Sequence, residues 1–246
     1  MENNIACVTD IGNFRKNNED MGYYAKSKFG TLLLVCDGMG GHKKGEVAAK
    51  IIVDTIAKEF SSRKTSFNLS SLKKFAKRVI KKANSNVYKK ANSSEEYSEM
   101  GSTAVLAIVI QDYTQVISIG DSRCYTYSKK DKIKKITVDQ TYVEFLYETG
   151  RITESERENH PQKNLLLNAM GINDDLENIQ EITLKNNEYD SLILCSDGLY
   201  NAIKEQGMSD IMDDSNITTQ EKAKKMITES LVKSGSDNMT VVIMEK

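Results

Sequence analysis

Ten short apolar runs constrain the fold of this chain most strongly, because each has the length and the Val, Ile and Leu content of a β-strand. Several follow one another closely, and residues 110–113 (Ile-Gln-Asp-Tyr) are typical of a hairpin turn. Successive hairpins favour antiparallel pairing, since a parallel βαβ sheet needs a long crossover between strands. The predicted strands are residues 5–9, 21–25, 31–36, 103–110, 114–119, 124–128, 132–136, 179–184, 191–195 and 239–244.

Helical periodicity predicts three long amphipathic helices at 45–60, 71–91 and 219–234. Two shorter helices are predicted at 142–149 and 154–158, each preceded by the spacing of a capping box. The sequence has no internal repeat and no Pro- or Ser-rich linker. We therefore expect residues 1–246 to form a single domain of class α+β, in which helices cover the strands.

The charge balance gives the chain no general attraction for polyanions, because 34 basic and 35 acidic residues leave a net charge of −1. Lysines gather at 73–90 and 129–135, where a solvated helix face and a hairpin tip are favoured over a phosphate-backbone site. No apolar run approaches the roughly 20 residues of a membrane span, and the N-terminus lacks the pattern of a secretory signal. We expect a cytoplasmic protein that binds neither nucleic acid nor membrane.

The cysteines indicate the same compartment. Each lies in or beside a strand-like run, and none forms a Cys-x-x-Cys pair, so we expect buried reduced thiols rather than a zinc site. The four are Cys7, Cys36, Cys124 and Cys195.

Aspartates stand where predicted strands meet loops. Asp37 and Asp197 each follow a mostly apolar run of five residues and precede glycine, Asp121 follows a third run, and Asp237 precedes the strand predicted from Met239. A single Asp-Gly pair after a strand is typical of a turn. Four aspartates in such positions favour a shared site, because neighbouring strand ends lie close together in a sheet.

Clustered carboxylates need cations. Two of them about 4 Å apart repel by roughly 4 kcal/mol at an effective dielectric constant of 20. Ligands that offer only oxygen suit Mg²⁺ or Mn²⁺ better than zinc or copper. Residues 9–20 are interpreted either as a polar loop or as part of this site, with Arg15 as a bidentate phosphate ligand and Glu19 and Asp20 as acceptors for metal-bound waters.

Eight segments, in order, resemble the bacterial form of the type 2C, metal-dependent serine/threonine protein phosphatases (the PPM family). Each segment is weak alone, but the ordered set is specific and extends from Thr9 to the C-terminus. The segments are residues 9–20, 35–42 with 45–46 (VCDGMGGH, GE), 101–104 (GSTA), 120–123 (GDSR), 139–141 (DQT), 160–164 (HPQKN), 194–199 (LCSDGL) and 236–241 (SDNMTV).

The resemblance implies a two-layer antiparallel β-sandwich flanked by helix pairs, in the order α-β-β-α. It implies hydrolysis of phosphoserine and phosphothreonine in proteins by a hydroxide that bridges two Mn²⁺ or Mg²⁺ ions, without a covalent intermediate. Residues 141–170 would form the mobile flap beside the active site. A monomer is expected, acting on phosphorylated proteins that include a cognate serine/threonine kinase and its substrates.

The resemblance also implies residue roles. Asp37 would bridge both ions and the Gly38 carbonyl would bind one of them. Asp197 and Asp237 would complete the second ion's shell, and Asp121 would hold the third ion found in bacterial members. Arg15 would hold the phosphate, so Arg15, Asp37 and Asp197 are the expected catalytic residues. Behind the metal ligands, Glu19 and Asp20 would hold bound waters and Asn238 would stand beside them.

The sequence departs from the family in two places. Many eukaryotic members carry a histidine two residues after the bridging aspartate as general acid, whereas Met39 stands here. His42 is an alternative general acid, although a turn or helix-start role is favoured and a metal-bound water is the other proton source. Relatives often show Thr-Arg where this chain has Leu167 and Asn168, which bears on substrate preference.

Three functions stay open at this point. The favoured one is an active protein phosphatase, because every metal aspartate is present. The second is a non-catalytic binding module on the same fold, and metal-dependent turnover separates it from the first. The third is a hydrolase for small phosphoesters, which the same metal core would serve.

Overall fold

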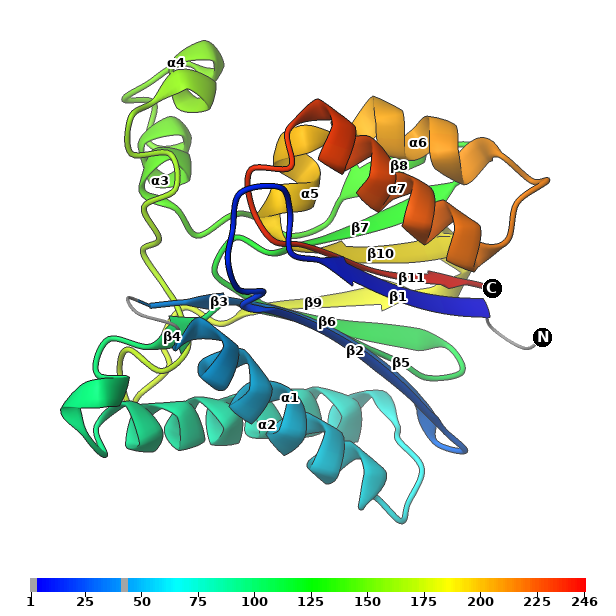
Figure 1. Ribbon diagram of the computed structural model, residues 1–246. Coiled ribbons are helices and arrows are strands. Elements are labelled where there is room, and N and C mark those ends of the chain that lie inside the picture. Colours follow the sequence, from blue (N-terminus) through cyan, green and yellow to red (C-terminus); the bar gives the residue numbers. More distant parts are fainter. Residues whose placement is uncertain (1–3, 41–43) are drawn as a thin grey trace.

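The structure is a computed structural model that describes residues 4–40 and 44–246, so His42 lies outside the described residues. Its strands form two antiparallel sheets, stacked face to face (Figure 1). One sheet has the order β1-β11-β10-β7-β8, and the other has the order β2-β3-β5-β6-β9 with β4 paired to β3. The strands are β1 (Asn4–Asp10), β2 (Asp20–Ser27), β3 (Gly30–Met39), β4 (Gly101–Ser102), β5 (Ala104–Val109), β6 (Tyr113–Ile119), β7 (Arg123–Ser128), β8 (Lys132–Lys135), β9 (Gln180–Lys185), β10 (Ser191–Cys195) and β11 (Met239–Glu245).

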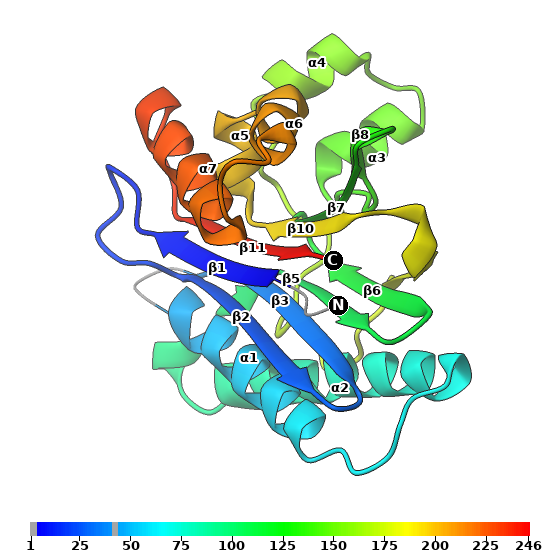
Figure 2. The same ribbon diagram turned by 90° about the vertical axis from the view of Figure 1, so that its right-hand side faces the viewer.

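Helices cover the outer face of each sheet (Figures 1 and 2). On one side α1 packs on β2 and β3 while α2 packs on β6, and on the other side α7 packs on β1 and β11 while α6 packs on β8. Two further helices, α3 and α4, stand apart from the sandwich beside one of its edges (Figure 1). The helices are α1 (Gly45–Ser61), α2 (Leu69–Ala91), α3 (Tyr142–Glu148), α4 (Glu154–Asn159), α5 (Asp197–Ala202), α6 (Glu205–Asp213) and α7 (Thr219–Lys233), with short 3₁₀ turns at Glu95–Tyr97 and Asn186–Glu188.

The layered arrangement explains why the central strands are apolar without alternation. Successive side chains of a strand point to opposite faces, and in β3 both faces are covered. Leu33 and Val35 pack between the two sheets, whereas Leu32 and Leu34 pack under α1 and α2. Every residue from Leu32 to Cys36 is therefore fully buried.

The predicted α-β-β-α sandwich is confirmed. All ten predicted strands and all five predicted helices are present, with ends that differ by at most three residues. Sequence reasoning did not predict β4, α5 or α6. Three of the four cysteines are buried, but Cys7 is partly exposed. Within the described residues, every helix is too short or too polar to cross a membrane.

Candidate metal centre

Five aspartates gather at one edge of the sandwich. Asp20 and Asp37 are cross-strand partners at the ends of β2 and β3, and the other three come from separate places in the chain. Asp121 lies two residues after β6, Asp197 is the first residue of α5, and Asp237 lies two residues before β11.

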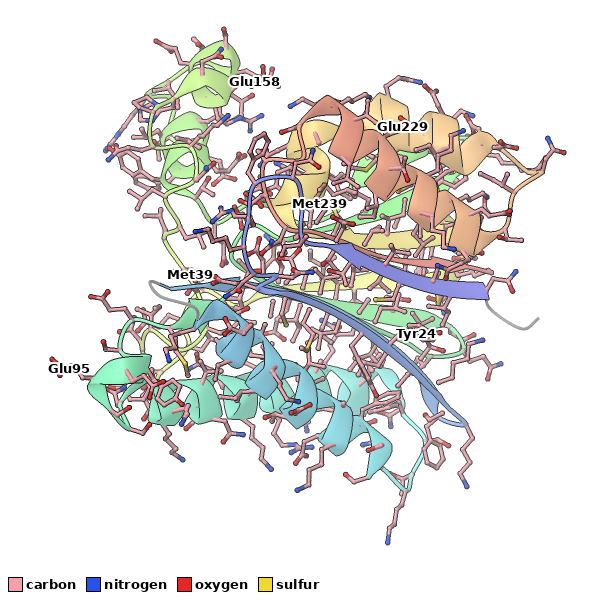
Figure 3. The ribbon with its side chains drawn as sticks, in the orientation of Figure 1. Tyr24, Met39, Glu95, Glu158, Glu229 and Met239 are labelled. Carbon is pink, nitrogen blue, oxygen red and sulfur yellow. The ribbon has the colours of Figure 1, made fainter. Side chains whose placement is uncertain are left out.

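Figure 3 locates this edge. Met39, the last residue of β3, and Met239, the first residue of β11, lie toward the same end of the sandwich, and polar side chains fill the region between them. Tyr24 of β2 lies toward the other end. The strand ends that carry Asp37 and Asp237 therefore lie toward the same end of the sandwich.

Neither Asp-Gly pair forms the simple turn that a single pair would suggest. Gly38 lies inside β3 and Gly198 lies inside α5. A Cβ atom at Gly38 would lie 2.3 Å from the carbonyl of Gly45, and one at Gly198 would lie 2.1 Å from the carbonyl oxygen of Asn238. Glycine is required at both positions because another backbone approaches closely, and this contact holds each aspartate against the neighbouring segment.

Thr103 joins the Asp37 strand to the Asp121 loop. Its Oγ1 accepts a hydrogen bond from the Asp37 backbone N–H at 3.1 Å, and its own N–H donates to the Asp37 carbonyl oxygen at 2.9 Å. The same hydroxyl lies 2.7 Å from the Oγ of Ser122, which follows Asp121. The two aspartates are thus fixed relative to each other by one buried hydroxyl pair.

Asp20 is held by a residue far away in the sequence. Its Oδ2 accepts a hydrogen bond of 2.6 Å from the Ser196 hydroxyl, which in turn accepts one from the Thr240 N–H at 2.9 Å. The other oxygen, Oδ1, is buried without a hydrogen-bond partner among the described residues. An unsatisfied buried carboxylate oxygen is costly, and a cation or a water bound to a cation would satisfy it.

Asn238 organises the loop between β1 and β2. Its side-chain amide donates to the carbonyl oxygens of Ile11 and Asn17, each at 2.9 Å, and its Oδ1 accepts from the Glu19 N–H at 2.8 Å. One side chain therefore sets both ends of the loop that carries Arg15. Its role behind the metal ligands stays a prediction.

Arg15 and Asp237 form an ion pair, with Nη2 and Oδ2 separated by 2.7 Å. The Arg15 side chain is 56% exposed, so one face of the guanidinium stays open to solvent. A guanidinium fork beside carboxylates is suited to bind a phosphate group bidentately.

Burial and neighbouring negative charges make the ionised form of these aspartates unfavourable. Burial raises the pKa of Asp20 to about 7, that of Asp121 to about 8 and that of Asp197 to about 6. The negative charge of a neighbouring aspartate adds to the shift in each case. Burial, and then the charges of Asp20 and Asp197, raise the pKa of Asp37 well above its usual range.

The carboxylates are neighbours without forming a finished ligand cage. In residues 4–40 and 44–246, no three acidic, histidine or cysteine side chains converge tightly enough to hold an ion as they stand. Four aspartates with raised pKa values and one unsatisfied buried oxygen are nevertheless the donor set that a hard divalent cation requires.

A cavity of about 470 Å³ opens beside Asp121, between α3 and α4 on one wall and α5 and α6 on the other. Arg123 forms part of its floor, where the guanidinium lies 3.4 Å from the ring centre of Tyr200 and donates to the carboxylate of Asp139. The edge of the centre thus continues into a cleft large enough for a peptide side chain.

The segment predicted as a flap, residues 141–170, forms the outer wall of this cleft. Thr141 pairs with Leu166 at its base, and Arg157 of α4 binds Glu144 of α3 at 2.7 Å. Glu144 was expected to complete a capping box with Thr141, and its N–H does bond the threonine hydroxyl. The Glu144 carboxylate instead pairs with Arg157 and so links α3 to α4.

Sequence reasoning named the aspartates but missed the residues that position them. Thr103, Ser122 and Ser196 lie in segments that carry the family resemblance, yet no role could be assigned to them. Their partners are up to 176 residues away. The available signal was a serine directly beside Asp121 and another directly beside Asp197, whereas nothing in the sequence pointed to Thr103.

Comparison with known proteins decides the family. The family model described as protein phosphatase 2C matches residues 15–233. The chain belongs to the protein phosphatase 2C family. A relative from Listeria innocua, the serine/threonine phosphatase stp, is 33% identical over 239 residues, covering 97% of this chain and 94% of the relative. Protein phosphatase PhpP of Streptococcus pneumoniae is 27% identical and covers 98% of this chain and 96% of its own.

Solved 2C phosphatase structures share the whole fold. The serine/threonine phosphatase Stp1 from Staphylococcus aureus superposes with a TM-score of 0.93 at 30% identity, covering 100% of this chain and 96% of that one. The catalytic domain of the phosphatase PstP, solved in complex with 2 manganese ions, superposes with a TM-score of 0.83 at 27% identity, covering 99% of this chain and 97% of that one.

Proposed function

We propose that this chain is a serine/threonine protein phosphatase that hydrolyses phosphoserine and phosphothreonine in other proteins with the help of two Mn²⁺ or Mg²⁺ ions. The observation that carries the proposal is the gathering of five aspartates at one edge of the sandwich, four of them with raised pKa values. Divalent cations stabilise the ionised carboxylates of such a cluster, which otherwise hold protons. The relatives named as serine/threonine phosphatases support the substrate class.

Asp37, the Gly38 carbonyl, Asp197 and Asp237 would hold the two ions, with Asp37 as the ligand that both would share. Asp121 would take a third ion. Glu19, Asp20 and Asn238 would orient waters and loops around them. When bound, two such ions lower the pKa of the attacking water and offset negative charge on the phosphoryl oxygens.

The chain's own side chains fit a mechanism without a covalent intermediate. Burial raises the pKa of the Cys36 and Cys195 thiols, which keeps both protonated near neutral pH. Neither thiol is therefore suited to attack phosphorus. The four cysteines are free thiols, which supports the further proposal that the protein works in the reducing cytoplasm.

The proposed function is tested by phosphate release from a phosphothreonine peptide, measured with Mn²⁺ and with EDTA. We expect release that requires Mn²⁺ and falls to the uncatalysed level when EDTA removes it. Faster turnover of sugar phosphates or nucleotides than of the peptide would instead favour a small-phosphoester hydrolase. Folded protein that binds Mn²⁺ and releases no phosphate from any of these would favour a binding module.

Replacing Arg15 tests its proposed role as the phosphate ligand. Replacement by Ala should lower kcat/KM for the phosphothreonine peptide about 100-fold, because a charge-assisted bidentate contact to the phosphate is lost. Arg15→Lys should recover only part of the loss, since an ammonium group cannot reproduce the fork.

Manganese affinity is measured alongside, because Arg15 also contacts Asp237. An unchanged kcat/KM in Arg15→Ala at saturating Mn²⁺ would exclude Arg15 as the phosphate ligand.

The flap and the partners complete the proposal. Residues 141–170 would select among protein substrates, because they wall the cleft beside Asp121. The proposed substrates are phosphorylated proteins, including a serine/threonine kinase and the targets of that kinase, and the protein would act on them as a monomer.

A further inference from the structure

Three exposed apolar side chains lie on the loop that carries Arg15 and on the helix end that contacts this loop, and the chemistry proposed above does not use them. Phe14 is 75% exposed, Val232 is 82% exposed and Ile11 is 38% exposed. We call these three residues the apolar rim. A single exposed apolar side chain is ordinary, but this set combines the loop between β1 and β2 with the end of α7, which lies more than 200 residues later in the sequence.

Direct contacts bring the two segments of the rim together. The side-chain amide of Asn13, next to Phe14, donates to the carbonyl oxygen of Leu231, next to Val232, at 3.0 Å. The Asn13 backbone N–H also donates to the Gly235 carbonyl oxygen at 2.7 Å. Phe14 and Val232 are therefore each one residue from the same contact.

The loop that carries the rim is fixed in place. Gly12 has φ +80, and a Cβ there would lie 2.3 Å from the carbonyl oxygen of Asp237, so only glycine fits. Asn238 binds the carbonyl oxygens of Ile11 and Asn17 on either side of Phe14. The Phe14 ring is thus held in solvent by a well-anchored backbone, where an apolar ligand could bind it without first ordering the loop.

The position of Phe14 indicates what would bind it. Arg15 is the next residue and the proposed phosphate ligand, and each residue of an extended peptide spans about 3.3–3.6 Å. A phosphate held by Arg15 places the residues beside the phosphorylated one within reach of the rim. Arg15 is already paired with Asp237 at 2.7 Å, so the exposed Phe14 ring, and not an unpaired charge, is the feature of this loop that a neighbouring substrate side chain would meet.

We propose that the apolar rim binds an apolar side chain next to the phosphorylated residue, so that the enzyme prefers phosphoproteins with Leu, Ile, Met or Phe at that position. This proposal rests on the proposed function. Phe14 and Val232 would determine specificity without taking part in the chemical step, and their contribution would appear in KM rather than in kcat.

The test uses the full chain with Mn²⁺ and sets of phosphothreonine peptides that are identical except for Leu, Ser or Lys at each residue flanking the phosphothreonine in turn. Free O-phospho-L-threonine serves as a substrate without flanking residues. At the flanking position that contacts the rim, we expect kcat/KM for the Leu peptide to exceed that for the Ser peptide about tenfold, which corresponds to about 55 Å² of apolar surface removed from water. Phe14→Ala and Val232→Ser should each bring that ratio close to one, and Phe14→Leu should retain most of it.

The matched control is Tyr24→Ala, which removes an exposed aromatic side chain from β2 toward the other end of the sandwich (Figure 3). It should keep the full preference for the Leu peptide. Equal kcat/KM for Leu and Ser peptides at every position, an unchanged ratio in Phe14→Ala, or a preference for the Lys peptides would each overturn the proposal. Absence of Mn²⁺-dependent release from every substrate would overturn the proposed function together with it, whereas release without discrimination overturns the rim alone.

Discussion

Replacing Asp197 with Asn is expected to lower kcat for the phosphothreonine peptide about 1,000-fold at saturating Mn²⁺. The change keeps the shape of the side chain but removes one negative charge and one strong oxygen ligand from the centre. Metal ions contribute several kcal/mol of transition-state stabilisation in such sites, and about 4 kcal/mol corresponds to a factor of 1,000 in rate. Steady-state phosphate release, with Mn²⁺ affinity measured by calorimetry, checks the prediction.

The same substitution at Asp54 is the matched control for Asp197→Asn. Asp54 lies on the exposed face of α1, where it forms an i, i+4 pair with Lys50 and both side chains are 63% exposed. Such surface pairs contribute little to stability, so Asp54→Asn should leave activity unchanged. If Asp197→Asn kept more than a tenth of the wild-type kcat, the assignment of this aspartate to the metal centre would be wrong.

Metal-free protein is expected to lose stability as the pH rises from about 5.5 to 8. The folded pKa values of Asp20, Asp121 and Asp197 are raised to between about 6 and about 8, whereas an unfolded aspartate ionises near 3.9. In this window the folded state binds protons that the unfolded chain has released, so the free energy of unfolding falls with increasing pH.

The size of the effect follows from the same shifts. Each pKa unit corresponds to about 1.4 kcal/mol, and because the carboxyls influence one another we expect a few kcal/mol in total. For a chain of this size that lowers Tm by about 10 °C. Thermal unfolding followed by circular dichroism, with EDTA and with Mn²⁺, measures it. Manganese should abolish or reverse the loss, because it binds the ionised carboxylates.

Asp20→Asn provides the control, since it removes one of the titrating groups and should flatten the metal-free profile. Asp54→Asn should leave the profile unchanged. A metal-free Tm that stays level or rises between pH 5.5 and 8 would contradict the clustering of carboxylates at this edge.

Strands were predictable where both faces are buried. The run at Leu32–Cys36 is apolar at every position because helices cover one face and the second sheet covers the other. By contrast, α5 begins at Asp197 inside a pattern typical of a turn, and its six residues are too few to show helical periodicity. The two residues of β4 leave no periodic signal at all.

The acidic residues of the site could be predicted from the sequence, but the hydrogen bonds that position them could not. Asp37 and Asp197 stand out because a charged residue interrupts an apolar run, and the order of the motifs supplied the rest. Ser196 could not be linked to Asp20, since that contact depends on how the two sheets stack. The rim could not be predicted either, because the segments that carry Phe14 and Val232 come together only where Asn13 binds the end of α7.

The pairing of β1 with β11 has a consequence for biosynthesis. Val8 pairs with Val241, and Asn238 orders the loop around Arg15, so the first and last tenths of the chain must meet before the centre exists. During synthesis, Asp37 therefore leaves the ribosome long before β11 and Asn238, which are needed to assemble the site. We expect translation products that end before residue 237 to be inactive, because they lack both Asp237 and the side chain that orders the loop around Arg15.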